Sequence, residues 1–264
     1  MTDEENEPTV EAVPEAAAAV FGDAWPAVEA FASLLVAEGE LRGLIGPREL
    51  PRLWTRHVLN SSAVASFIPH GVRFADVGSG AGFPGVVIAI MRPDLDVHLV
   101  EPMERRTTWL EDVARALALE NVTVVRARAE ELHGTELFDV VSARAVAALR
   151  KLAPWVAPLI RPGGALVALK GERAALEVDE AAKMLRKHQL SEATVHEILV
   201  AGTDEPTRVV TASKAGRPAR RLDPSSVVYP TVCATTVAPL KGCAEGGSTF
   251  HVEPHRFAAL HARP

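Results

Sequence analysis

The sequence predicts an α/β fold in which a mostly parallel sheet of seven strands carries helices on both faces. The first observation is a regular alternation of short β-branched runs with longer amphipathic segments from residue 72 onward, which is typical of a doubly wound sheet. The second is a glycine-rich turn between a strand-like run and an apolar helix, at residues 76–85. The third is apolar spacing of helical period within residues 20–68, which predicts a helical cap before the first strand.

The expected elements follow from local pattern. The helices share apolar residues at helical spacing, and we place them at residues 25–35 and 53–67 in the cap, then at 86–91, 104–118 and 176–188. The strands share β-branched and apolar residues bounded by turn residues, and we place them at residues 72–75, 96–100, 121–125, 138–142, 165–169, 194–200 and 208–212.

Charge and composition divide the chain into three parts. Residues 1–41 hold ten acids and no lysine or arginine, and residues 1–19 are expected to be a disordered acidic leader. Residues 20–221 form the expected domain, with its helical cap at 20–68. Residues 222–264 are rich in proline, glycine, serine and threonine and are expected to be an irregular tail. Without the ten acids the net charge would change from −6 to +4, which is mild for a partner of nucleic acid.

The cysteine positions and the lengths of the apolar runs indicate the compartment of the protein and whether it binds a metal. Cys233 and Cys243 lie in the tail and form no C-x-x-C pair, so neither a disulfide framework nor a metal site is expected. We find no apolar run of the roughly 18 residues that a membrane span needs. The acidic amino terminus does not resemble a signal peptide. The expected compartment is the cytoplasm.

The glycine loop reads D-V-G-S-G-A-G-F-P-G over residues 76–85 and predicts a nucleotide pocket. Residues 80–85 satisfy the G-x-G-x-x-G pattern of dinucleotide-binding proteins. Residues 76–82 equally satisfy the acid-x-G-x-G-x-G loop of enzymes that use S-adenosylmethionine. Asp76 favours the second class, because a carboxylate attracts the cationic end of that cofactor and repels a pyrophosphate. A tight turn without a ligand stays open as an alternative.

Two further positions fit a nucleotide cofactor. Glu101 ends the second expected strand, roughly 20 residues after the loop, where an acid accepts hydrogen bonds from ribose hydroxyls. The alternative is an exposed acid at the start of the next helix. Ala129 and Glu130 follow the third expected strand and are candidates for contact with the adenine, although such an acidic loop is commonly only solvated.

The motifs occur in an order that resembles one known family, the bacterial 16S ribosomal RNA guanine-7 methyltransferases, also called glucose-inhibited division protein B. Five segments carry the resemblance: R-H-V-L-N-S at 56–61, the glycine loop at 76–85, S-A-R-A at 142–145, L-K-G at 169–171 and R-V-V at 208–210. Asn60 stands where the family usually has aspartate. The third segment resembles either the family's S-R-A segment with one residue inserted or its alternative S-x-R-A form. The resemblance covers about residues 20–215.

This resemblance implies a Rossmann-like class I methyltransferase fold whose last strand is antiparallel, with S-adenosylmethionine as the cofactor. It implies the following cofactor-binding set: Asp76, Gly78, Gly80, Gly82, Phe83, Glu101, Ala129, Glu130 and Arg144. Arg144 and Lys170 would be the catalytic residues, placed where cofactor and guanine meet. Arg56, His57 and Arg208 would contact RNA. The alternatives are a salt bridge for Arg144, a surface position for Lys170 and a bracing role for Arg208.

The implied chemistry is methyl transfer to the seven-position nitrogen of a guanine in 16S ribosomal RNA, within the small ribosomal subunit or a precursor particle. That nitrogen carries a lone pair and no proton, so the attack needs no general base. Residues 142–145 do not match the N-P-P-Y segment of enzymes that methylate exocyclic amines. A class I methyltransferase of a small molecule or a protein stays open, and so does a nicotinamide-dependent oxidoreductase.

Overall fold

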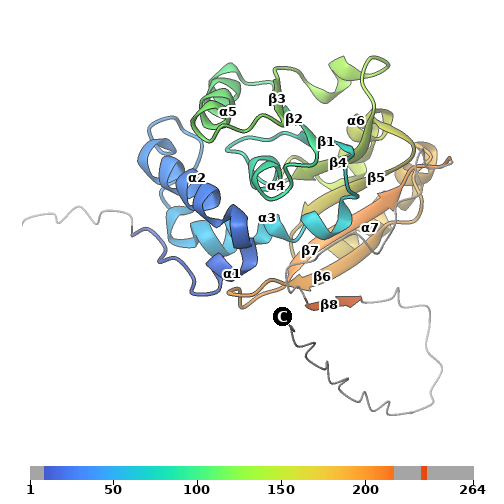
Figure 1. Cartoon of the computed structure of the whole chain (residues 1–264). Helices are drawn as coiled ribbons and strands as arrows, with labels where there is room; N and C mark the ends of the chain where they lie inside the picture. Colours follow the sequence, from blue (N-terminus) through green and yellow to red (C-terminus); the bar gives the residue numbers. More distant parts are fainter. Residues whose placement is uncertain (1–8, 217–232, 237–264) are drawn as a thin grey trace, which may run out of the picture.

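The computed structural model describes residues 9–216 and 233–236, and Figure 1 shows its arrangement. One mixed sheet has the order β3-β2-β1-β4-β5-β7-β6-β8. Its strands are β1 (Arg73–Val77), β2 (Asp96–Val100), β3 (Val122–Val125), β4 (Phe138–Arg144), β5 (Ile160–Lys170), β6 (Thr194–Leu199), β7 (Thr207–Ser213) and β8 (Cys233–Thr236). β1 to β5 are mutually parallel, whereas β7 runs antiparallel to both β5 and β6. The predicted seven-stranded, mostly parallel sheet with an antiparallel last strand is therefore confirmed.

The strand order changes direction between β1 and β4. β2 and β3 lie on one side of β1, and β4 and β5 lie on the other. Connections from β1 and β4 therefore leave the sheet in opposite directions, which opens a crevice at the carboxyl ends of these two strands. The fold thus places the glycine loop after β1 and Arg144 at the end of β4 beside the same crevice.

Helices cover both faces of the sheet. One apolar cluster packs α4 (Gly85–Met91) and α5 (Glu104–Ala116) on one face, together with the amino-terminal cap. The other packs α6 (Leu149–Val156) and α7 (Ala174–Lys187) on the opposite face. Strand residues alternate between the clusters, as Phe74 and Ala75 do on β1. β1 and β4 are buried on both faces, and their polar residues Asp76 and Ser142 are buried with the apolar ones.

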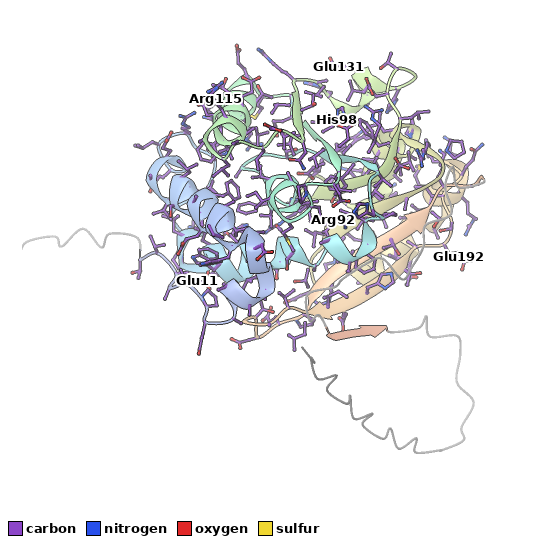
Figure 2. All side chains as sticks on the ribbon, viewed as in Figure 1. Glu11, Arg92, His98, Arg115, Glu131 and Glu192 are labelled. Carbon is purple, nitrogen blue, oxygen red and sulfur yellow. The ribbon has the colours of Figure 1, made fainter. Side chains whose placement is uncertain are left out.

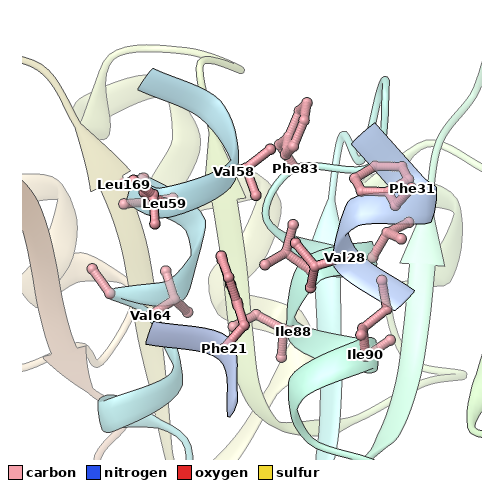
Figure 3. Packing of buried hydrophobic residues seen from close by; sticks show 14 of the residues in the cluster. Phe21, Val28, Phe31, Val58, Leu59, Val64, Phe83, Ile88, Ile90 and Leu169 are labelled. Carbon is pink, nitrogen blue, oxygen red and sulfur yellow. The ribbon is translucent and has the colours of Figure 1, made fainter. Parts of the chain in front are cut away.

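The cap lies against the first cluster and continues up to the glycine loop. It consists of α1 (Ala17–Phe21), η1 (Gly22–Ala24), α2 (Trp25–Glu38), η2 (Leu50–Arg52), the π-helix η3 (Leu53–Leu59), α3 (Asn60–Ser62) and η4 (Ala65–Phe67). Figure 3 shows Phe83 of the loop close to Phe31 of α2, and the two ring centroids are 5.4 Å apart. The single helix expected over residues 53–67 is instead three short helical pieces, of which the wide π-turn carries Arg56 and His57.

The expected leader is partly ordered. The Glu11 carboxylate, labelled in Figure 2, accepts hydrogen bonds from the backbone N–H groups of Trp54 at 2.7 Å and Thr55 at 3.1 Å. Ala17 is fully buried in the core. The expectation of disorder is thus wrong for residues 11–19, because a buried side chain and charge-assisted hydrogen bonds fix this segment to the cap. Residues 1–8 lie outside the described residues.

Two further expectations change. β8 pairs antiparallel with β6, so the expected irregular tail contributes one strand; residues 217–232 and 237–264 lie outside the described residues. The 22-residue stretch Ala17–Glu38 contains an 18-residue window with a mean hydropathy of 1.3, so by length and composition alone it could cross a membrane, although we expected no such run. In the fold, Val28, Phe31 and Leu35 of this stretch are fully buried in the protein core, and 33% of the window is buried.

Candidate functional site

A cavity of about 1480 Å³ lies at the carboxyl edge of the sheet, between the cap and the ends of β1, β2, β4 and β5. Nine of the thirteen expected site residues line it: Arg56, His57, Gly78, Gly80, Phe83, Glu101, Arg144, Lys170 and Arg208. The other four, Asp76, Gly82, Ala129 and Glu130, are not among its lining residues. The fold therefore brings residues from five separate motifs to one cavity.

The glycine loop has two faces with different requirements. Gly80 has a φ of +56°, and a Cβ there would have only the Gly78 carbonyl oxygen within 4 Å, at 3.7 Å. That side of the loop is open to the cavity, and the positive φ favours glycine. A Cβ at Gly82 would lie 2.7 Å from Val86 Cγ2 and 3.0 Å from Phe31 Cζ, so Gly82 faces the core. Gly80 is thus a loop residue with open space beside its backbone.

Asp76 lies beneath the loop and is fully buried. Its Oδ2 accepts a hydrogen bond of 2.9 Å from the Gly85 N–H, while its Oδ1 has no partner among the described residues. Ser142 occupies the register position opposite Asp76 on β4, and its buried Oγ also has no partner there. Burial raises the pKa of Asp76 to about 7. Direct contact between Asp76 and a ligand stays a prediction, because the carboxylate is next to the cavity and does not line it.

Glu101 is the buried acid that supports the loop. It is 2% exposed, and its carboxylate accepts hydrogen bonds of 3.0 Å from the Gly80 N–H and 3.0 Å from the Met103 N–H. Arg106 Nη1 lies 3.7 Å from Glu101 Oε2. Each carboxylate oxygen has two acceptor positions, so these contacts leave capacity for ligand hydroxyl groups.

The loop after β2 supplies cavity residues that the sequence analysis did not select. Pro102, Met103 and Arg106 line the cavity, and Met103 is 44% exposed. Ala129, in contrast, is buried in the second apolar cluster, and Glu130 is exposed outside the cavity. The sequence did contain a signal for Met103, because it follows Glu101 at the end of a strand. An apolar side chain close to a polar group is typical of a ligand pocket.

Arg144 links the end of β4 to the cap. Its guanidinium donates hydrogen bonds to the Arg56 carbonyl at 2.9 Å and the His57 carbonyl at 3.3 Å. It also lies 2.8 Å from His57 Nδ1, and its Cζ is 5.6 Å from the centroid of the Phe83 ring. Within the described part of the chain Arg144 therefore forms no direct salt bridge, so the alternative of a salt bridge is not supported. Its contacts connect the cap to the glycine loop.

His57 contacts an acid that lies outside the family motif, because the motif position that usually holds an aspartate is Asn60 in this chain. Its Nε2 lies 2.9 Å from Glu49 Oε2. Asn60, at the motif's acid position, instead accepts a hydrogen bond of 2.5 Å from Thr207 Oγ1. Burial and the nearby Arg144 charge lower the pKa of His57 to about 4, so its ring is neutral at physiological pH. Glu49 was not among the expected site residues, because it lies outside the motif in a separate segment of the cap.

Lys170 and Arg208 stand opposite each other on β5 and β7, and each is held by an acid. Lys170 Nζ lies 2.9 Å from Glu177 Oε2 and donates a hydrogen bond of 2.6 Å to the Ala147 carbonyl. Its side chain is 8% exposed, so the surface-lysine alternative is wrong. Arg208 donates a hydrogen bond of 2.9 Å from Nε to Glu197 on β6, in agreement with the bracing alternative, and also lines the cavity.

Comparisons with known proteins identify what this chain resembles. Residues 25–204 match the profile of the GidB family, described as rRNA small subunit methyltransferase G. A ribosomal RNA small subunit methyltransferase G of Beutenbergia cavernae is 54% identical over 196 residues, which span 74% of this chain and 92% of the relative. Proteins of the same name from Leifsonia xyli subsp. xyli and Thermobifida fusca are 51% and 50% identical over 78% and 74% of this chain, and over 98% and 83% of their own lengths.

Proposed function

Because this chain belongs to the rRNA small subunit methyltransferase G family, we propose that it methylates the seven-position nitrogen of a guanine in 16S ribosomal RNA, with S-adenosylmethionine as donor. The observation that carries the proposal is the cavity that the glycine loop, Glu101 and Arg144 share. Its volume of about 1480 Å³ leaves room for a cofactor and a nucleotide side by side.

The residues present fit the cofactor. Gly80 offers an open backbone surface, Glu101 offers free acceptor positions for ribose hydroxyls, and Met103 offers an apolar surface for the adenine ring. Asp76 retains one buried oxygen without a partner among the described residues. A cation bound above the loop would favour its ionised form. When bound, S-adenosylmethionine supplies an electrophilic methyl group on a sulfonium.

The proposed reaction asks the protein for alignment and charge balance. The guanine nitrogen attacks with its own lone pair, so no residue has to remove a proton before the transfer. Methyl transfer moves a positive charge onto the base, and an unbalanced cation near the base would oppose it. Lys170 is paired with Glu177, and Arg144 is linked through His57 to Glu49. Lys170 is therefore balanced by a direct ion pair, whereas the direct partners of Arg144 among the described residues are neutral. The proposed role of both cations is to hold the base and the cavity walls in place.

The rim of the cavity supports a substrate with a phosphate backbone. Arg52 and Arg56 line the cavity, and their side chains are half exposed. Arg208 lines it from the β7 side. Arginine is well suited to phosphate, because its planar guanidinium donates two parallel hydrogen bonds. In this proposal the three arginines bind phosphate groups of the RNA substrate. The RNA would be part of the small ribosomal subunit or of a precursor particle in the cytoplasm.

The decisive test is transfer of labelled methyl from S-adenosylmethionine to small ribosomal subunits from cells that lack the gene, followed by mass analysis of the nucleosides. We expect 7-methylguanosine in 16S RNA. Binding of S-adenosylhomocysteine without transfer to subunits or precursor particles would contradict the RNA substrate and favour a small molecule or a protein. Binding of NAD in place of S-adenosylhomocysteine would contradict the cofactor.

A further inference from the structure

We propose that Glu49 is a positioning residue, which acts through His57 to hold the Arg144 guanidinium at the junction between the cap and the glycine loop. The inference rests on the proposed function for its kinetic consequence, but its structural part stands on geometry alone. Glu49 immediately precedes η2 of the cap, far from the glycine loop in sequence. The chain of contacts runs from Glu49 Oε2 to His57 Nε2 at 2.9 Å, and from His57 Nδ1 to Arg144 Nη2 at 2.8 Å.

The hydrogen-bonding chemistry gives this chain a direction. Arginine only donates hydrogen bonds, so His57 Nδ1 must accept from Arg144. In a neutral imidazole the other nitrogen then carries the proton, and Nε2–H donates to the Glu49 carboxylate. A carboxylate, which only accepts, is the partner that matches this arrangement. The three groups therefore satisfy one another in a single proton arrangement.

The arrangement orients the ring as well as its protons. The His57 side chain is largely buried, and its ring centroid lies 5.3 Å from that of Phe83 on the glycine loop. Loss of Glu49 would leave the Nε2–H without this acceptor, and the ring would then be free to turn toward solvent. Arg144 would lose its side-chain partner and keep only the two carbonyl groups of η3. Its guanidinium would no longer have a fixed position over Phe83.

The position matters because Arg144 stands where the two parts of the cavity meet. On one side lie the glycine loop and Glu101, and on the other lie Lys170 and Arg208. A guanidinium displaced at this junction changes the approach of one ligand to the other without removing either binding surface. We therefore expect loss of Glu49 to lower kcat by about tenfold and to leave the KM for the cofactor within about twofold, since misalignment affects the transfer step.

The structural part is tested on the protein without substrate. Slowed rotation and exchange of the Arg144 guanidinium N–H groups, measured by nitrogen-15 nuclear magnetic resonance, report whether the side chain is held. We expect resolved Arg144 resonances in the wild type and averaged ones in Glu49→Ala and in His57→Phe, which keeps an aromatic ring against Phe83. Glu49→Gln retains an oxygen acceptor for Nε2–H, so it should restore the resolved resonances.

A matched control separates this role from the loss of any surface carboxylate. Glu136 pairs with Arg73 at 3.1 Å at the amino end of the sheet, and its side chain is 40% exposed, close to the 31% of Glu49. Glu136→Ala should change neither the Arg144 resonances nor kcat. Unchanged Arg144 resonances in Glu49→Ala would overturn the proposal. Averaged resonances together with unchanged kcat would overturn its kinetic part. If the wild type methylates no RNA, the proposed function fails, and the resonances still decide the positioning role.

Discussion

The buried carboxylate beneath the glycine loop gives a prediction that connects the stability of the fold to its pH dependence. Asp76 accepts a hydrogen bond from the Gly85 N–H at 2.9 Å, and burial raises its pKa from an ordinary value of 3.8 to about 7. Asp76→Asn keeps an oxygen acceptor for Gly85 and removes the charge. The new amide N–H groups would have a candidate acceptor on the adjacent strand in Ser142 Oγ, which has no partner within the described residues.

The sign of the effect follows from proton binding. Between pH 3.8 and 7 the folded state binds a proton at Asp76 that the unfolded state releases, so this group lowers the free energy of unfolding as the pH rises through that window. The full shift corresponds to roughly 4 kcal/mol, of which about 2–3 kcal/mol falls between pH 5 and pH 8.5. The amide that replaces the carboxyl group in the variant does not titrate. The stability of the variant relative to the wild type should therefore increase by that amount over this range.

Urea unfolding of both proteins at pH 5, 6, 7 and 8.5 measures the difference directly. His57, whose lowered pKa gives the opposite slope between pH 6.5 and about 4, is present in both proteins and cancels in the comparison. A constant difference in unfolding free energy across the four pH values would refute the reasoning, because it would mean that Asp76 has the same pKa in both states.

The same variant tests whether Asp76 acts on the cofactor through space. S-adenosylmethionine carries a sulfonium charge, and S-adenosylhomocysteine lacks it. If the carboxylate attracts that charge across the loop, Asp76→Asn should weaken binding of the first ligand by about tenfold and change binding of the second much less. Equal losses for both ligands in isothermal titration would indicate a distorted loop instead.

Three further predictions concern single cavity residues. Gly80→Asp should abolish binding of S-adenosylhomocysteine in isothermal titration, because the new side chain fills the open side of the loop. Gly134→Asp is the control and should leave this binding unchanged. Gly134 also has a positive φ and open surroundings, but it lies outside the cavity. Arg144→Ala should reduce methyl transfer at least about 100-fold and lower the unfolding free energy by about 1–3 kcal/mol, since three hydrogen bonds to the cap are lost; normal turnover would leave it a structural role only. Lys170→Met should lower the free energy of unfolding in urea by about 3 kcal/mol, because it leaves the Glu177 carboxylate without its cation. Lys170→Met combined with Glu177→Gln should recover part of that loss. Full stability of the single variant would contradict the ion pair.

Local sequence pattern was sufficient for the features that depend on neighbouring residues. The alternation of β-branched runs with amphipathic segments predicted the seven strands of the mostly parallel sheet, because strand and helix periods are properties of adjacent positions. The glycine loop was identifiable for the same reason, since the positive φ at Gly80 is a requirement on one residue. Residues within the five motifs could be carried over one by one, and nine of the thirteen expected residues line the cavity.

Which side chains meet depends on how the elements pack, and the sequence did not reveal it. Glu49 belongs to the site through its contact with His57, which no local pattern indicates. Met103 lines the cavity, whereas Ala129 and Glu130 do not. Asp76 is fully buried and contacts the loop backbone from below, a position that the motif alone did not indicate. The physical reason is that periodicity fixes which face of an element is apolar, whereas burial, pKa and partners depend on elements that approach one another only after the chain has folded.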